Sequence, residues 1–368
     1  MGERVLVAMS GGVDSSVAAA LLHDQGHEVI GVWMRLHDGA DAASEFRKSC
    51  CSLDAADDAR RVAAQIGIPF YILNLEREFA AGVLDRFLAA YLGGETPSPC
   101  VDCNTAVKFG ALLGRAHLVY DCDAVATGHY ARVDMVGGAT GDGAGTRPPH
   151  RLLRGRDPDK DQSYFLYGLG QEQLGRTRFP LGELTKPQVR EIARSRGLVT
   201  ASTPESQELC FVPGDYRDAL RERAGWRESP GPMLDADGSM VGSHRGAAAY
   251  TVGQRTGLGV ALGEPRYVAT IDPVANLVRL GRREDLRRTS FTVRDTSFVA
   301  GEPPDGQAFA AQVRIRHRAT PVQATIRHES ADRWHVSTDE PVWAPAPGQA
   351  AVFYSGDEVV GGGRIARD

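Results

Sequence analysis

Lysine is scarce in this sequence, with only Lys48, Lys108, Lys160 and Lys186. Arginine must therefore supply nearly all of the positive contacts. No apolar run approaches the roughly 20 residues of a membrane span, and the first residues do not form a signal-peptide pattern. The net charge of −5 excludes a protein that coats nucleic acid unspecifically, although a local basic groove remains open. We expect a cytoplasmic protein that does not contact a membrane.

Cysteine is also infrequent, with six in 368 residues and no regular spacing. In a cytoplasmic chain this favours reactive or metal-binding thiols over structural disulfides. Cys122 is predicted to be a small core residue. For the adjacent pair Cys50 and Cys51 we favour a structural role.

The first 130 residues alternate between strand and helix patterns, which predicts an α/β fold with a doubly wound parallel sheet. A Gly- and Pro-rich connector at 137–149 predicts a mobile hairpin tip. After about residue 208, short alternating strands and frequent turns indicate small β-domains or a barrel, with a further break near residue 283. The strands are expected at 5–9, 28–34, 69–73 and 124–127, and the helices at 15–25, 53–66, 76–92, 104–118 and 185–197.

The first strand is followed by the heptapeptide SGGVDSS, residues 10–16. Its glycines allow backbone N–H groups to approach an anion, and the next helix adds its positive end. Serine hydroxyls add donors, and Asp14 is in a position to reach a bound Mg²⁺. The lysine that the G-x-x-x-x-G-K-[ST] loop requires does not follow these glycines. The loop therefore suits the binding of pyrophosphate during chemistry at the α-phosphate. A tight turn without any ligand is the competing interpretation.

This loop resembles that of the PP-loop ATP pyrophosphatases, which transfer AMP to an oxygen and release pyrophosphate. The resemblance implies that the ATP contacts are Ala8, Met9, Ser10, Gly11, Gly12, Val13, Asp14, Ser15, Ser16, Met34 and Gly128.

Two cysteine motifs bear on what is adenylated. In TPSPCVDCNTAVKF (96–109), Cys100 and Cys103 stand just ahead of the predicted helix, where the helix dipole favours a thiolate. Cys210 lies far along the chain in SQELCF (206–211). The pair C-x-x-C alone is half of a zinc site, and the three thiols together are also a candidate set for a [4Fe-4S] cluster. The residues by themselves leave these alternatives open.

Seven stretches in order are similar to the tRNA-specific 2-thiouridylases, over essentially the whole length. They are SGGVDSS, TPSPCVDCN with KF, ATGHYAR, KDQSYFL, FPLGELTKPQVREIA, SQELCF and YTVGQRTGLG. The resemblance implies a PP-loop catalytic domain at 1–208, a small, mostly β central domain at 209–283 and a tRNA-contacting β-barrel at 284–368.

The resemblance also implies the reaction, which is 2-thiolation of the wobble uridine of tRNA with ATP and Mg²⁺. The uracil oxygen at carbon 2 is adenylated, Cys210 carries sulfur as a persulfide, and Cys103 is the nucleophile that releases it, leaving a Cys103–Cys210 disulfide. The implied partners are tRNAs for Glu, Gln and Lys and a cysteine desulfurase or sulfur-relay protein. We expect a monomer.

The chain departs from many relatives at two positions of the first cysteine motif. Cys100 stands where they carry an aspartate proposed as general acid/base, and Ser98 replaces an asparagine. Cys100 takes over the proton transfer if its pKa lies near the working pH. Otherwise water does so, or Cys100 is a cluster ligand.

The stretch VRIRHRATPV (313–322) predicts a strand with Arg314, Arg316 and Arg318 on one face and His317 opposite. Such a row suits tRNA phosphates, although a solvated outer strand face is the plain alternative. Arg282, Arg283, Arg287 and Arg288 extend the predicted basic track. By resemblance, the tRNA contacts are Pro97, Ser98, Pro99, His129, Lys160, Asp161, Gln162, Arg316, His317 and Gln349.

Two rival functions are weighed against thiolation. One is a PP-loop synthetase that adenylates a small molecule, which needs no Cys210. The other is a non-catalytic RNA-binding module with an iron–sulfur cluster, which needs no ATP loop.

Overall fold

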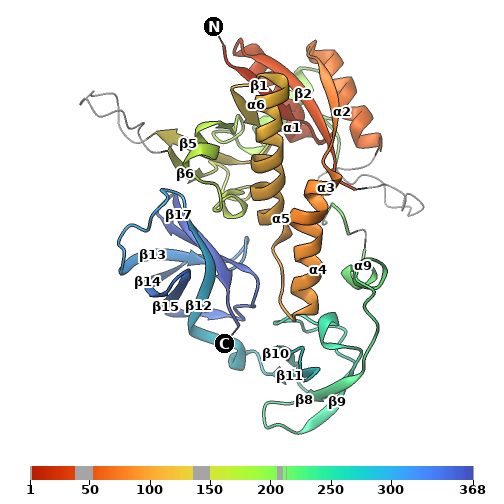
Figure 1. Ribbon diagram of the computed structural model, residues 1–368, viewed down its shortest axis with the longest axis vertical. Helices are drawn as coiled ribbons and strands as arrows, with labels where there is room; N and C mark the ends of the chain where they lie inside the picture. The colour runs from red at the N-terminus through yellow and green to blue at the C-terminus, as the bar shows by residue number, and fades with distance from the viewer. Residues whose placement is uncertain (1, 38–52, 136–149, 205–209, 213, 368) are drawn as a thin grey trace.

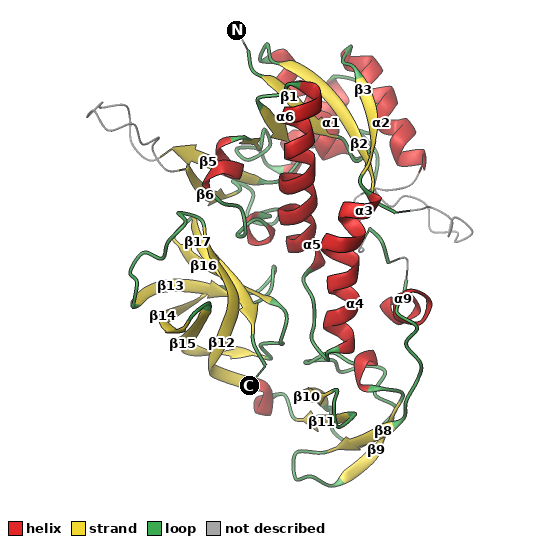
Figure 2. Ribbon diagram, in the orientation of Figure 1, coloured by secondary structure: helices red, strands yellow, loops and turns green. Residues whose placement is uncertain are grey.

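The computed structural model describes residues 2–37, 53–135, 150–204, 210–212 and 214–367 (Figures 1 and 2). The predicted roles of Cys50 and Cys51, and the connector at 137–149, lie outside the described residues. In the described ranges, none of the helices combines the length and apolar character that a membrane span needs.

Five strands of the described chain form a parallel sheet in the order β3-β2-β1-β4-β7. The predicted doubly wound parallel sheet is therefore confirmed. Because β2 and β4 flank β1 on opposite sides, a switch point lies between β1 and β4, where ligands bind in such sheets. The strands are β1 (Arg4–Ala8), β2 (Glu28–Arg35), β3 (Phe70–Asn74), β4 (Ala124–Ala126) and β7 (Thr177–Arg178).

Alternating side chains of β1 build two cores, one on each face of the sheet. Val5 and Val7 belong to one core and Leu6 and Ala8 to the other, because successive strand residues point to opposite faces. Helices α1 (Val13–Asp24), α2 (Leu53–Ile66) and α8 (Lys186–Ser195) cover the first core.

The second core is covered by two longer helical runs. The run predicted at 76–92 has its expected inner face, since Phe79, Val83, Phe87 and Tyr91 are all buried. Each run contains a π-helical segment, a feature that often accompanies functional sites. The runs are α3 (Glu76–Phe79), η2 (Ala80–Leu84) and α4 (Asp85–Leu92), and α5 (Pro99–Asp102), η3 (Cys103–Ala111) and α6 (Leu112–Tyr120).

The second run begins earlier than the start predicted at residue 104. Pro99 takes its first position, directly after Ser98, and a proline there loses no hydrogen bond because the first helical N–H groups have no partner in the helix. The run ends at Asp121, which adopts a left-handed backbone with φ 51°. Cys100 and Cys103 thus lie within the helix, not ahead of it.

The C-terminal strands of the described chain close into a barrel. β12 pairs with both β15 and β17, which joins the ends of the order β12-β15-β14-β13-β16-β17. The barrel expected in this half is confirmed. Its strands are β12 (Arg287–Phe298), β13 (Ala308–Arg314), β14 (Val322–Ser330), β15 (Arg333–Trp343), β16 (Ala350–Ser355) and β17 (Glu358–Ile365).

A hairpin of the first domain extends the barrel sheet. Strands β5 (Ala131–Met135) and β6 (His150–Arg154) are antiparallel neighbours, and β6 also pairs with β17. The α/β part and the barrel are therefore joined by backbone hydrogen bonds.

The central part contains a small sheet in the order β10-β11-β8-β9. Helix α9 (Tyr216–Arg223) precedes it and was not predicted, because Leu220 is its only buried residue and gives little apolar periodicity. The strands are β8 (Gly231–Leu234), β9 (Met240–His244), β10 (Tyr267–Asp272) and β11 (Leu277–Gly281).

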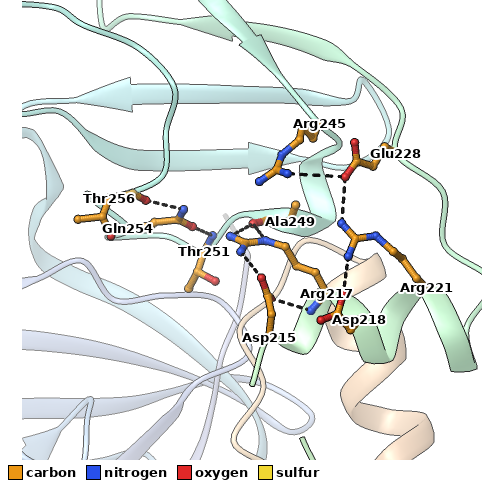
Figure 3. Close-up of polar contacts among 10 residues, drawn as sticks. All are labelled: Asp215, Arg217, Asp218, Arg221, Glu228, Arg245, Ala249, Thr251, Gln254 and Thr256. Atoms are coloured by element: carbon orange, nitrogen blue, oxygen red, sulfur yellow. Dashed lines mark hydrogen bonds and ion pairs between the residues drawn. The ribbon is translucent and has the colours of Figure 1, made fainter. Parts of the chain in front are cut away.

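Polar contacts fasten α9 to Ala249 and to Glu228, which lie in the segments beside the central sheet (Figure 3). The Arg217 guanidinium donates to the Ala249 carbonyl at 3.0 and 2.9 Å and to Asp215 at 2.8 Å. Arg221 bridges Asp218 and Glu228 at 2.6 and 2.9 Å. These contacts fix the segment that follows Cys210.

Candidate active site

The glycine-rich loop connects β1 to α1 at the carboxyl edge of the sheet. Gly11 has φ +76°, and a Cβ there would lie 2.2 Å from the Ala55 carbonyl oxygen, so this position requires glycine. The Ser10 amide donates to Ser15 Oγ at 3.1 Å, and Ser16 Oγ donates to the Gly12 carbonyl at 2.8 Å. The loop is thus held by its own hydroxyls.

Gly128 follows β4, on the other side of the switch point. A Cβ at this residue would come within 2.8 Å of Asp14 C and Ser15 N. The fold therefore brings Gly128 against the loop. Met9 donates its amide to the Val32 carbonyl at 2.8 Å, and Met34 lies two residues further along β2, at the same edge.

Two residues that the sequence analysis missed complete this site. Lys186 Nζ lies 2.8 and 2.7 Å from the two carboxylate oxygens of Asp14. The Tyr130 hydroxyl donates to Asp14 Oδ1 at 2.8 Å. The scarcity of lysine, with only four in the chain, is the one signal in the sequence that could have drawn attention to Lys186.

The first cysteine motif presents its two thiols differently. Cys100 is exposed, whereas Cys103 is buried, with 8% of its surface accessible. Between them, the buried Asp102 carboxylate pairs with Arg364 of β17 and lies 3.5 Å from Arg86. Burial raises the pKa of Asp102, and the two guanidinium groups oppose that shift. The cysteine helix is thereby tied to the barrel.

Cys210 packs against the core to which Cys103 belongs. Its neighbour Phe211 makes edge-on contacts with Phe79 and Phe87, with ring centroids 5.2 and 5.1 Å apart. Tyr216 of α9 stacks on Tyr91 at 4.0 Å. Aromatic contacts therefore hold the second cysteine segment against α3 and α4.

The remaining described cysteine lies in the core. Cys122 is 1% exposed, and burial raises the pKa of its thiol to about 11, which confirms the predicted core role. Within the described ranges, no group of three or more His, Cys, Asp or Glu residues is arranged to hold a metal ion.

Several residues expected to touch tRNA are buried. His129 is 8% exposed and shares a 2.6 Å hydrogen bond with Thr127 Oγ1. Burial, together with the nearby Lys108 cation, holds the pKa of His129 well below its usual value. Asp161 is 3% exposed. The burial of both side chains favours a positioning role.

The predicted arginine row on one strand face is wrong. Strand β13 ends at Arg314, so Arg316, His317 and Arg318 follow it in turns. Arg314 pairs with Asp161 at 3.1 Å, which removes it from phosphate contact. Arg314 thus pairs with a carboxylate of the α/β part, and the residues after it do not continue the strand.

Other predicted tRNA residues hold neighbouring backbone. Arg316 donates to the Trp343 and Ala344 carbonyls at 3.3 and 2.8 Å. His317 Nε2 lies 2.7 Å from the Asp161 carbonyl oxygen, and burial lowers the pKa of His317. Gln162 accepts from the Tyr130 amide at 3.1 Å. By contrast, the added track of Arg282, Arg283, Arg287 and Arg288 is exposed.

Comparison with known proteins adds an independent line of evidence. The family profile described as "tRNA methyl transferase HUP domain" matches residues 3–214. Profiles described as a tRNA methyl transferase PRC-barrel domain and an aminomethyltransferase beta-barrel domain match residues 218–282 and 288–365.

Full-length relatives carry a more specific name. The "tRNA-specific 2-thiouridylase MnmA" of Roseiflexus castenholzii is 48% identical, over 99% of this chain and 100% of the relative. The protein of the same name from Chloroflexus aggregans is 51% identical, over 99% and 98%.

Proposed function

The chain belongs to the family of tRNA-specific 2-thiouridylases, and from this premise we propose that it thiolates the wobble uridine of tRNA at carbon 2. The reaction consumes ATP and takes place in the cytoplasm. The observation that carries the proposal is the intact SGGVDSS loop at the β1/β4 switch point, within a chain that matches thiouridylases over nearly its full length.

The loop supports adenylation of the uracil oxygen. Backbone N–H groups and the Ser10, Ser15 and Ser16 hydroxyls bind the phosphates. The carboxylate of Asp14 and the loop hydroxyls are the oxygen donors that suit Mg²⁺, which supplies charge neutralisation at the phosphates when bound. Ala8, Met9, Met34 and Gly128 form the remaining nucleotide contacts.

The cysteines transfer sulfur to the activated carbon. A cysteine desulfurase or a relay protein supplies sulfur to Cys210, which carries it as a persulfide. The Cys103 thiolate attacks the inner sulfur of Cys210, releasing the outer sulfur to carbon 2, and AMP leaves from that carbon with its oxygen. The resulting Cys103–Cys210 disulfide needs a cellular reductant, and Cys100 is the proposed proton carrier.

The target base must leave the stack to reach this chemistry. We propose that it lies near Pro97, Ser98 and Pro99, and that Lys160, Gln162, Arg316 and Gln349 contact the tRNA. His129, Asp161 and His317 act there through their neighbours, because they are buried or bound to backbone. We propose tRNAs for Glu, Gln and Lys as substrates and a monomeric enzyme.

Thiolation in vitro tests this function. Unmodified tRNA, ATP, Mg²⁺ and a desulfurase with cysteine are incubated without oxygen, and thiolated tRNA is detected by retardation on a mercury gel. The wild type is expected to thiolate, whereas Cys210→Ser and Cys103→Ser lose the product. Cys122→Ala is the matched control, because this thiol lies in the core and takes no part in transfer.

The same assay separates the rivals. Product that requires iron–sulfur reconstitution of the wild type would favour a cluster-dependent variant of thiolation. Absence of product under both conditions, with pyrophosphate still released without RNA, would return the chain to the small-molecule synthetases.

A further inference from the structure

Three residues lie side by side on neighbouring strands of the barrel. In the register of the sheet, Arg364 of β17 is the partner of Arg294 of β12 and also of Ala350 of β16. The residues next to them in their strands, Val293 and Ile365, belong to the barrel core. Because successive strand residues point to opposite faces, the three residues face outward. We call them the barrel row.

The barrel row contacts the segment that leads into the first cysteine motif. This segment runs alongside the barrel between α4 and α5 (Figure 1). Arg294 donates to the two carboxylate oxygens of Glu95 at 3.0 and 2.8 Å. The Ala350 amide donates to Ser98 Oγ at 3.2 Å. Two members of the row thus hold the start of the motif.

The third member of the row holds the motif further along. Arg364 pairs with the carboxylate of Asp102, whose side chain is only 4% exposed. The same carboxylate oxygen lies 3.5 Å from Arg86 of α4. A buried carboxylate between two guanidinium groups has little freedom to move. Asp102 is therefore anchored between the barrel and α4.

Asp102 is the residue directly before Cys103. It is the last residue of α5, and Cys103 is the first residue of the π-helical segment η3. The anchor thus lies where the hydrogen-bond pattern of the helix changes. Since neighbouring helix residues share a rigid backbone, the anchor at Asp102 also fixes the direction of the Cys103 side chain.

We propose that Asp102 and Arg364 are a pair of positioning residues for the Cys103 nucleophile. They act through the backbone of the helix, and the role requires no contact with the sulfur or the base. The barrel thereby holds the nucleophile and the proposed seat of the target base, residues 97–99, in one fixed relation. This inference rests on the proposed function, in which Cys103 releases the sulfur.

Kinetics and thiol accessibility together test this role in the full-length protein. Arg364→Gln is compared with the double variant Asp102→Asn/Arg364→Gln, which removes both charges of the pair and so avoids a buried charge without its partner. For both we expect kcat of tRNA thiolation to fall by about 10- to 100-fold, with KM for tRNA and for ATP unchanged within about twofold.

The second measurement follows Cys103 alone. Iodoacetamide is added to the protein without tRNA or ATP, and alkylation of the Cys103 peptide is followed by mass spectrometry at a fixed pH. In both variants we expect alkylation to be about fivefold faster than in the wild type, because the start of the helix opens more often. Arg364→Lys keeps the charge and is expected to retain most of the wild-type behaviour.

Arg266→Gln is the matched control. It removes the guanidinium of another largely buried pair, in which Arg266 donates to both oxygens of Asp235 at 2.9 and 3.0 Å. Asp235 directly follows β8 of the central sheet. The control is expected to lose stability and to keep the wild-type kcat and the wild-type rate of Cys103 alkylation.

The outcomes separate two failures. If the wild type thiolates tRNA and the double variant keeps its kcat and its alkylation rate, the positioning role is overturned while the proposed function stands. An equal fall of kcat in Arg266→Gln also overturns it, because loss of stability would then be sufficient. If the wild type does not thiolate, the proposed function falls, and the alkylation rate decides whether the pair holds Cys103.

Discussion

His129 illustrates how burial sets the chemistry of a single residue. Its ring is enclosed by Phe109 and Phe179, with centroids 6.1 and 5.9 Å away. Such surroundings disfavour the imidazolium ion. The residue therefore acts as a neutral hydrogen-bonding partner of Thr127, not as a cation for phosphate.

This burial makes stability depend on pH. The pKa of His129 is lower in the folded chain than in the unfolded chain. At a pH below the pKa of the unfolded histidine, the unfolded chain therefore binds more protons than the folded chain. Stability is thus complete above about pH 6.5 and falls as the pH drops below it, by at most about 1.4 kcal/mol per pH unit for one histidine. Urea denaturation between pH 7.5 and 5.5 measures the slope.

The variant His129→Gln is expected to flatten this slope in part. His317 and His244, whose pKa values burial also lowers, account for the remainder. His23→Gln, at a half-exposed position, is the control for a histidine-to-glutamine exchange outside the core. An unaltered slope in His129→Gln would contradict the assigned burial effect.

At the scale of elements, the site depends on a close approach between the end of β4 and the start of α1. Gly128 makes this approach possible, because any Cβ would collide with the backbone of Asp14 and Ser15. The strand patterns predicted both elements. Their contact follows from the sheet order, which local patterns do not specify.

We expect Gly128→Ala to push the loop from its position and to weaken ATP binding about tenfold, with about 1–3 kcal/mol lost from the free energy of unfolding. Calorimetric titration and urea denaturation measure the two effects. Gly114→Ala is the matched control, since an added Cβ at this exposed residue of α6 meets nothing within 4 Å. The control should gain about 0.5–1 kcal/mol, because alanine favours the helix. Equal ATP binding by wild type and Gly128→Ala would refute the close-approach argument.

At the scale of the whole molecule, the domains are joined by buried polar contacts as well as by the β6–β17 pairing. Asp161 accepts from the Gly155 and Ser163 amides at 3.2 and 3.0 Å and pairs with Arg314 of the barrel. The Arg314 side chain is only 11% exposed. The pair therefore connects the α/β domain to the barrel.

Removing one partner should leave an uncompensated buried charge. For Arg314→Gln we expect a loss of about 3 kcal/mol in the free energy of unfolding, measured by urea denaturation. Arg318→Gln, at an exposed position four residues later, should change it by less than about 0.5 kcal/mol. If the two variants are equally stable, Arg314 does not hold the domains together.

The sequence by itself determined the fold class, the loop and the cysteine motifs, because each rests on residues close together in the chain. The periodic spacing of apolar residues in strands and helices is a local feature of the sequence. The SGGVDSS motif indicates a phosphate-binding loop within seven residues. Domain boundaries at 208 and 283, and the roles of Cys100, Cys103 and Cys210, stay predictions.

Only the tertiary structure decided which distant groups meet. It brought Lys186 to Asp14, turned Arg314 inward to Asp161 and tied Asp102 to Arg364. Local sequence patterns do not predict such pairs. The attraction between two charges depends on their distance in space and on their burial, and both are set only when the elements pack together and exclude water.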